Sequence, residues 1–480
     1  MGASRMMVIV MICLAGCAAD CHRDRDDIYA GDLNAMILHY RDNQNRLPNH
    51  IAVHDVTGVF ATDSAQGAID LGNEFFQSLG TNGRRCVSCH VPTVGWTITP
   101  RQLQAAFSQT DGGTLDDDLG IGAVFRAVDG ANAPTVDVST RESRRRAYSM
   151  LLTRGLIRIG LPIPDGAEFE LVAVDDPYSF ASAKELSLFR RPLPTANLKF
   201  DSTVMWDGRE VVPGATVESE LETQASHATV VHAQGAPLDS AQRASIAHFI
   251  TALASAQIID HRAGWLDDDG ARGGPQPILK QPFHIGINDN AGDSVTGAPF
   301  SPVVFDLFDG WTHNRGTHGD AREQIARGQV LFNSKPIAIT GVSGINDEPA
   351  FGAPARLTGT CSTCHNTPNG GSHSVVAPLN LGLVDASRRT ADMPLYTLRN
   401  KTTGERVQVT DPGRALVDGK WRHIGRFKGP ILRDLAPRAP YFHNGFAADL
   451  WAVVMFYDQR FSIGFTYAEK ADLVAFLQSL

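Results

Sequence analysis

Two short cysteine–histidine motifs are the strongest chemical signal in this 480-residue sequence. Both read C-x-x-C-H, and their residues are Cys86, Cys89, His90, Cys361, Cys364 and His365. This spacing attaches c-type haem, because the two thiols add to the porphyrin vinyl groups and the adjacent histidine reaches the iron. Chance predicts only about 0.003 such motifs from this composition. The two pairs also lie too far apart for a shared zinc site, so the sequence predicts two covalently bound haem c groups.

The segments around the motifs show helical patterns. Residues 65–79 and 321–332 have apolar side chains at helical spacing, and each precedes one motif. Residues 241–257 follow the N-cap candidates Asp239 and Ser240, and a final helix follows Thr466. We therefore expect a mainly α fold: two tandem cytochrome c-like haem domains with long loops and few short strands.

Composition and charge exclude several other classes of protein. Hydrophobic residues make up 43% of the chain and charged residues 20%, which is typical of globular proteins. A formal net charge of −9 argues against a nucleic-acid-binding surface. The predicted division is a signal peptide (1–16), a tether with an N-terminal segment (17–60), an N-terminal haem domain (61–262), a linker (263–280) and a C-terminal haem domain (281–480).

The N-terminus has the pattern of a secretory signal. Arg5 precedes the apolar run 6–16, which is too short to span a bilayer, and Cys17 follows small residues. Residues 14–17 (LAGC) resemble a bacterial lipobox, which implies a lipidated Cys17 and a lipid anchor on the periplasmic side, at the outer membrane. The alternative is a plain signal peptide. Export of the protein agrees with the predicted haems, because bacteria attach haem c outside the cytoplasm.

Two blocks of sequence resemble the bacterial di-haem cytochrome c peroxidases and their relative MauG. The first contains RRPLPTAN (190–197) and MWDGR (205–209), and the second contains GRFK (425–428), APYFHNG (439–445) and VVMFY (453–457). The resemblance implies that the N-terminal haem reacts with peroxide and that the C-terminal haem receives electrons. It also implies that Trp206 relays electrons between them, although an ordinary buried tryptophan is the alternative.

Peroxide reduction also needs an acid/base group, since a proton must move from one peroxide oxygen to the other. The family resemblance implies a glutamate ten residues after Gln224, but that position holds Gln234, which cannot exchange a proton. His232 is the candidate replacement, with sixth iron ligand or structural histidine as alternatives, and Glu222 is a reserve acid. The loop 91–107 contains no histidine, which implies an open first haem, as in MauG.

The distal ligand of the second haem remains open between two residues of the apolar segment 449–458. The family register favours Tyr457, as in MauG, while Met455 lies about 200° away around a helix. Only one of them can face the iron, and another ligand or none is the third possibility. A methionine raises the haem potential, whereas a phenolate donates charge and lowers it.

The resemblance suggests further site residues. His443, Arg209 and Arg433 are expected near haem propionates. A calcium ion is an additional candidate, held by the carbonyls of Arg438 and Pro440, although Arg191 replaces the asparagine that the family uses. The remaining candidates, expected to be loop histidines, are His313, His318 and His373.

Three functions follow from these observations. The first is a peroxidase that reduces hydrogen peroxide with electrons from a small periplasmic cytochrome c or cupredoxin. The second is a MauG-like enzyme that oxidises a side chain of a partner protein. The third is a non-catalytic di-haem electron carrier. None involves nucleic acid, and contact with a membrane would occur only through the lipid anchor.

Overall fold

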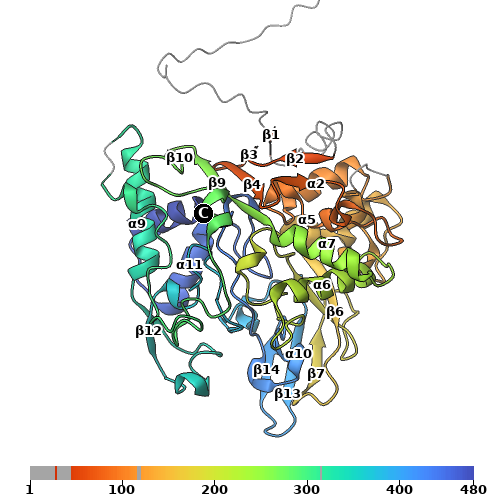
Figure 1. Ribbon diagram of the computed structural model, residues 1–480. Coiled ribbons are helices and arrows are strands. Elements are labelled where there is room, and N and C mark those ends of the chain that lie inside the picture. Colours follow the sequence, from red (N-terminus) through yellow and green to blue (C-terminus); the bar gives the residue numbers. More distant parts are fainter. Residues whose placement is uncertain (1–27, 30–44, 116–119, 314–315) are drawn as a thin grey trace, which may run out of the picture.

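A five-stranded sheet joins the beginning and the middle of the chain in the computed structural model, which describes residues 28–29, 45–115, 120–313 and 316–480 (Figure 1). Its strand order is β1-β3-β4-β9-β10, and only β1 and β3 pair in parallel. The strands are β1 (Ile28–Tyr29), β3 (Ile51–His54), β4 (Gly58–Ser64), β9 (Leu253–Asp260) and β10 (Gly264–Trp265). The residues assigned above to the tether and the linker thus contribute strands.

Four smaller sheets contain the other strands. They are β2 (Arg46–Pro48) with β5 (Ala68–Asp70), β6 (Ile157–Leu161) with β8 (Leu186–Arg190), β11 (Ile337–Ile339) with β12 (Leu357–Gly359), and β14 (Arg406–Val409) with β13 (Leu395–Asn400) and β7 (Phe169–Asp175). The last sheet combines strands from both halves of the chain. The expectation of few strands is therefore corrected, because long-range pairing orders segments that read as loops.

Helices supply the rest of the regular structure. They are α2 (Pro100–Gln109), α3 (Ala127–Gly130), α4 (Arg141–Ala147), α5 (Ser149–Arg154), α6 (Val217–Val231), α7 (Ser240–Thr251), α8 (Pro275–Lys280), α9 (Gly319–Ser334), α10 (Ala415–Asp418), α11 (Leu450–Phe461) and α12 (Tyr467–Gln478). The N-caps Asp239 and Thr466 are confirmed, since each side chain accepts a hydrogen bond from a backbone N–H of the first turn. No helix within the described ranges is long and apolar enough to cross a membrane.

Two predicted helices differ from the structure. Residues 65–79 form β5 and a single 3₁₀ turn at Glu74–Phe76, because Gly67 has a φ of +84° and further glycines interrupt the run. The helix predicted over 241–257 ends at Thr251. The residues after it pair with β4 instead, where Leu253, Ala254 and Ala256 are buried, so sheet burial overrides their helical pattern.

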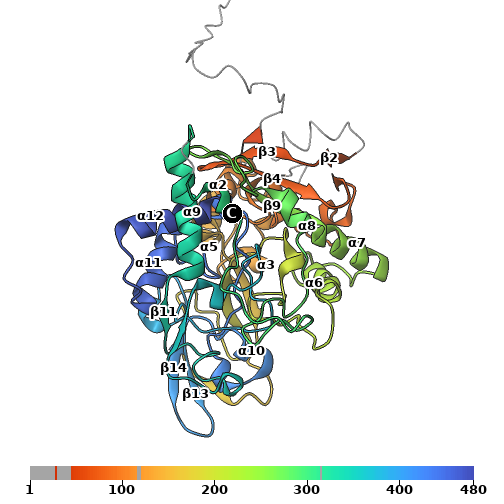
Figure 2. The ribbon, with the colours of Figure 1, turned by 60° about the vertical axis from the view of Figure 1, so that its left-hand side comes forward.

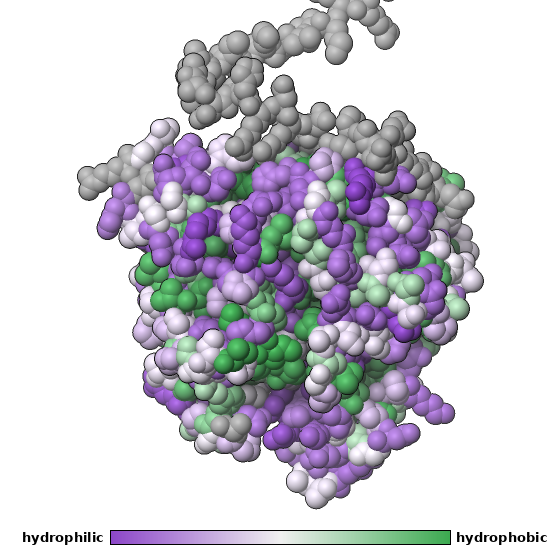
Figure 3. Space-filling view, viewed as in Figure 1, coloured by the Kyte–Doolittle hydropathy of each residue, from purple (hydrophilic) through white to green (hydrophobic). Residues whose placement is uncertain are grey.

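Two large apolar clusters form the cores, one in each half. The first surrounds Phe75, Trp96 and Phe249, and the second surrounds Phe305 and Phe476. In the second cluster, the helices α9 and α12 lie side by side (Figure 2). The face of the molecule in Figure 3 is largely hydrophilic, with apolar side chains in small groups.

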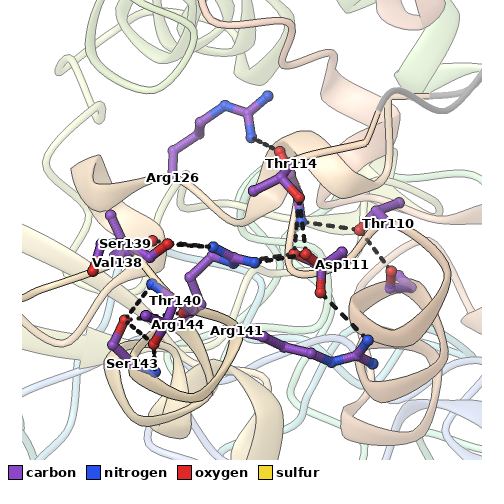
Figure 4. Close-up of polar contacts among 12 residues, drawn as sticks. Thr110, Asp111, Thr114, Arg126, Val138, Ser139, Thr140, Arg141, Ser143 and Arg144 are labelled. Carbon is purple, nitrogen blue, oxygen red and sulfur yellow. Dashed lines mark hydrogen bonds and ion pairs between the residues drawn. The ribbon is translucent and has the colours of Figure 1, made fainter.

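A polar network orders the loops that follow α2 (Figure 4). The Arg144 guanidinium donates to the carboxylate of Asp111 at 2.7 Å, and Arg141 lies 3.3 Å from the same carboxylate. Arg126 donates to the carbonyls of Gly113 and Asn82, at 3.0 and 3.1 Å. These bonds connect the segment after residue 120 to the loop that leads into the first motif.

The packing of α9 on α12 depends on Gly328. A Cβ at this position would lie 2.0 Å from the Asp472 carbonyl oxygen and 2.6 Å from the Cβ of Phe476. We expect Gly328→Ala to lower the free energy of unfolding by about 1–3 kcal/mol, because the helices must separate. Urea denaturation measures this, and Val330→Ala, at an exposed position of the same helix, is the matched control. Equal stability of the two variants would contradict the prediction.

Candidate functional site

The first motif forms one wall of an apolar cavity of about 180 Å³. Residues Cys86–Ser88 make a 3₁₀ turn, and the His90 N–H donates to the Cys86 carbonyl at 3.0 Å. Both thiols and the imidazole line the cavity, and α6 forms another part of the lining. One face of α6 and its C-cap supplies Val217, Leu221, Gln224, Ala225, Ala228, Thr229 and His232.

Burial shifts the pKa values of the side chains of this motif. Burial lowers the pKa of His90 to about 4 and raises the pKa of Cys86 to about 12. The imidazole is therefore neutral, and its Nδ1 lies 3.4 Å from the Trp96 carbonyl, which leaves Nε2 for the iron. Neither cysteine of the motif is in a disulfide.

The second motif repeats this arrangement at a cavity of about 220 Å³. Residues Cys361–Thr363 form the 3₁₀ turn, and Nδ1 of His365 lies 2.6 Å from the Gly371 carbonyl oxygen. Burial lowers the pKa of His365 and raises the pKa of Cys361 to about 12. The residues of both cavities therefore fit a covalently attached haem.

The helix α11 decides which predicted distal residue faces the second cavity. Tyr457 lines this cavity together with Leu450, Val453 and Val454, which lie on the same face of α11, whereas Met455 does not line it. Burial raises the pKa of Tyr457, so its phenol is protonated without a metal. Among the described residues, its hydroxyl has no hydrogen-bond partner. Of the two candidates, Tyr457 lines the second cavity and Met455 does not.

A thin wall separates the two cavities. Six residues line both of them: Arg191, Pro192, Leu193, Pro194, Trp206 and Lys428. The Trp206 indole N–H donates to the Arg191 carbonyl at 2.7 Å, and its ring lies 6.1 Å from the His443 ring. His443 stacks on Phe427 at 4.0 Å and lines the second cavity. The predicted relay residue therefore lies between the two cavities.

Buried ion pairs support this wall. The Arg190 guanidinium contacts Asp207 at 2.5 Å and Asp411 at 2.7 Å, and Arg209 contacts Asp207 at 3.1 Å. Burial alone would raise the pKa of Asp207, but Arg190 and Arg209 outweigh it and hold this pKa at about 2. Lys428 and Asp201 form a further buried pair at 2.5 Å.

His232 lies in the first cavity and is oriented by a carboxylate that the sequence did not indicate. Its Nδ1 is 2.7 Å from Oδ2 of Asp129, and Arg84 is 3.2 Å from the same oxygen. Arg84 also donates to the His232 carbonyl at 2.9 Å. Burial raises the pKa of Asp129, but the hydrogen bond from His232 and the charge of Arg84 reverse the shift and lower it. Asp129 has a φ of +62°, in a Val-Asp-Gly segment that reads only as a turn.

The other predicted residues lie in different parts of the molecule. Gln224 and Arg209 line the first cavity, whereas Gln234 is exposed and neither Gln234 nor Glu222 lines it. Arg433 is fully buried but lines neither cavity. His373 lies in a loop, as expected, and it also lines the second cavity, where burial lowers its pKa to about 4. Cys17 lies outside the described residues.

The residues named for calcium do not fit the ion. The Arg438 carbonyl, one of its two predicted ligands, accepts a hydrogen bond from the Arg191 guanidinium at 3.0 Å. The described part of the chain contains no cluster of three or more His, Cys, Asp or Glu side chains that could hold a metal. A positive charge of the protein therefore lies where the calcium was expected.

Comparisons with known proteins identify relatives for part of the chain. A cytochrome-c peroxidase, IdrP2, of Denitromonas iodatirespirans is 31% identical over 132 residues, which cover 25% of this chain and 36% of that protein. The methylamine utilization protein MauG of Paracoccus denitrificans (strain Pd 1222) is 29% identical over 120 residues, covering 23% and 27%. The matches thus span about a third of the relatives' length.

One solved structure aligns with most of the chain, at low sequence identity. A solved MauG-like protein associated with microbial copper homeostasis aligns with 86% of this chain and 87% of its own, at 16% identity and a TM-score of 0.38. No protein-family model matches the chain.

The ion pairs behind the wall give a stability prediction. We expect Asp207→Asn to lower the free energy of unfolding by about 3–5 kcal/mol near neutral pH, because Arg190 loses a buried partner. The carboxylate contributes fully above its ordinary pKa of 3.8 and loses its contribution as pH falls towards 2. The difference between the variant and the original protein should therefore narrow below about pH 4.

Urea denaturation at several pH values measures this difference. Glu142→Gln, which breaks the exposed pair with Arg146, is the control and should change stability little at any pH. If the free energies of unfolding of Asp207→Asn and the original protein differed by the same amount across this pH range, the low pKa of Asp207 would be contradicted.

Proposed function

Because the chain is related to the di-haem cytochrome c peroxidase and MauG family, we propose that it is a di-haem c-type oxidoreductase. It would hold two haems in tandem and reduce hydrogen peroxide at the N-terminal one, with electrons relayed from the C-terminal one. The observation that carries the proposal is the position of Trp206, which lines both cavities. When bound, the haem irons supply the redox chemistry.

Peroxide reduction consumes two electrons and two protons and yields two water molecules. In this proposal His232 takes a proton from one peroxide oxygen and delivers it to the departing oxygen. Asp129 accepts from Nδ1, so Nε2 of His232 is the nitrogen available to exchange that proton. Gln224 lies two turns earlier on the same face of α6 and supplies an amide to orient the peroxide.

The second candidate function, MauG-like oxidation of a partner protein, is supported by Tyr457. As a phenolate ligand, Tyr457 would donate charge to the second iron, lower its potential and stabilise its more oxidised states, which disfavours electron entry from a carrier. A di-haem electron carrier is the third candidate and would require both irons to be closed to peroxide.

The partners and the location belong to the same proposal. A small periplasmic cytochrome c or cupredoxin would supply electrons in a peroxidase, and a protein side chain would supply them in a MauG-like enzyme. A lipid on Cys17 would hold the protein at the periplasmic face of the outer membrane. An exported protein fits the proposed haems, because bacteria attach haem c outside the cytoplasm.

The acid/base role can be tested by replacing His232. We expect His232→Gln to lower the rate of reaction with hydrogen peroxide by about 10²- to 10⁴-fold, because glutamine cannot transfer a proton. Stopped-flow absorption of the purified holoprotein measures the rate. His227→Gln, at an exposed position of α6, is the matched control and should react normally.

Three outcomes separate the candidate functions. A normal rate in His232→Gln would contradict the acid/base role. If the original protein does not react with peroxide in either the oxidised or the half-reduced form, only the carrier remains. Reaction followed by oxidation of a partner protein, without turnover of a reduced cytochrome, would support the MauG-like function.

The ligand of the second haem can be tested by a pair of neighbouring variants. We expect Tyr457→Phe to raise the midpoint potential of one of the two haems, because a charge-donating ligand is lost. Met455→Leu should leave both potentials unchanged, since Met455 does not line the cavity. Spectroelectrochemical titration measures both, and the opposite pattern would contradict the assignment of Tyr457.

A further inference from the structure

The side chain of Arg191 lies in a cradle made of backbone oxygens. Its Nη1 donates to the Arg154 carbonyl at 2.8 Å, and its Nη2 donates to the carbonyls of Ile98 at 2.7 Å and Arg438 at 3.0 Å. Only 5% of Arg191 is exposed. The three carbonyls come from segments that are far apart in sequence, so a single guanidinium joins them.

The cradle is suited to a cation with several donors. Arg154 ends α5 and Arg438 ends a 3₁₀ turn (Ala436–Arg438), where carbonyls are not used within the helix and carry partial negative charge. A planar guanidinium offers five donors and can satisfy carbonyls in different directions. Gly155 makes room for it, since a Cβ there would lie 2.5 Å from Nη1.

A divalent ion does not suit this cradle. Calcium takes six to eight oxygen ligands, usually including carboxylates. Burial lowers the pKa of Arg191 to about 9, which still leaves the guanidinium charged near neutral pH. No carboxylate is among the groups that shift this pKa, so the carbonyl dipoles stabilise the guanidinium.

The backbone of the same residue contacts the electron path. The Arg191 carbonyl accepts from the Trp206 indole at 2.7 Å, and the Arg191 N–H donates to the His443 carbonyl, also at 2.7 Å. Side chain and backbone together therefore connect Trp206 to the three segments of the cradle.

We propose that Arg191 is a permanent internal cation that replaces a calcium ion between the two cavities and positions Trp206. The protein then needs no calcium for stability. This assignment depends on the proposed function only for the electron path, because metal content and stability can be measured without any enzymatic activity.

The first test uses the purified holoprotein. Elemental analysis should find no stoichiometric calcium, and EDTA or added calcium should leave the Tm unchanged. One calcium per chain, or a Tm that falls in EDTA and recovers with calcium, would overturn the proposal.

The second test uses variants of two arginines. We expect Arg191→Gln to lower the Tm by about 3–6 °C, because three buried carbonyls lose their cation. Arg154→Gln is the matched control: it breaks the pair with Asp392 but keeps the Arg154 carbonyl, so its Tm should fall less. Equal effects of the two substitutions would overturn the role of the cradle.

A milder variant separates charge from geometry and remains informative if Arg191→Gln does not fold. Arg191→Lys keeps the charge but loses the planar arrangement of donors, so its Tm should lie between those of Arg191→Gln and the original protein. Electron exchange between the haems should also slow at least about tenfold in this variant, while Arg154→Gln should exchange electrons at the original rate. An unchanged exchange rate in Arg191→Lys would overturn the positioning of Trp206.

Discussion

The wall between the two cavities is the constraint on which the rest of the structure depends. Under the proposed function, two redox groups would exchange electrons across this wall and would have to lie close together, yet a thin partition leaves little room for backbone hydrogen bonds. The segment 191–194 meets this requirement in an unusual way. Pro192 and Pro194 have no N–H to satisfy, while the N–H and carbonyl of Arg191 bond to His443 and Trp206. Few backbone groups in this segment need a hydrogen-bond partner, so a single layer of residues can separate the two cavities.

Charge inside this wall is balanced locally. Arg190 has two carboxylate partners and Lys428 has one, so these two buried cations are paired within a few ångströms. Unpaired buried charges would cost several kcal/mol each. Arg191 differs, because carbonyl dipoles rather than carboxylates surround it. It thereby adds one positive charge beside both cavities, and that charge favours electron density on the neighbouring groups.

Sequence patterns predicted those parts of the site that depend on residues close together in the sequence. The spacing of C-x-x-C-H fixes the turn and the direction of His90 and His365, and the caps at Asp239 and Thr466 fix where two helices begin. Contacts between distant segments could not be read in this way. Asp129 lies 103 positions from His232 and sits in an unremarkable turn. The cradle of Arg191 combines carbonyls, which every residue has, so no side-chain pattern reveals it.

The same reasoning explains why strand β9 was missed and why the choice between Tyr457 and Met455 stayed open in the sequence. Residues 253–257 continue a helical pattern, and only the presence of β4 beside them makes a strand more stable. On α11, sequence alone allows either Tyr457 or Met455 to face the second cavity. Packing fixes the rotation of the helix and turns Tyr457 inwards. If the phenolate binds iron, the low potential of the second haem disfavours electron entry from a high-potential carrier. A peroxidase built this way would need a strongly reducing donor, whereas oxidation of a partner side chain would need none. The identity of this one ligand therefore bears more on the choice between the two reactions than any residue of the first cavity, where both require the same proton transfer.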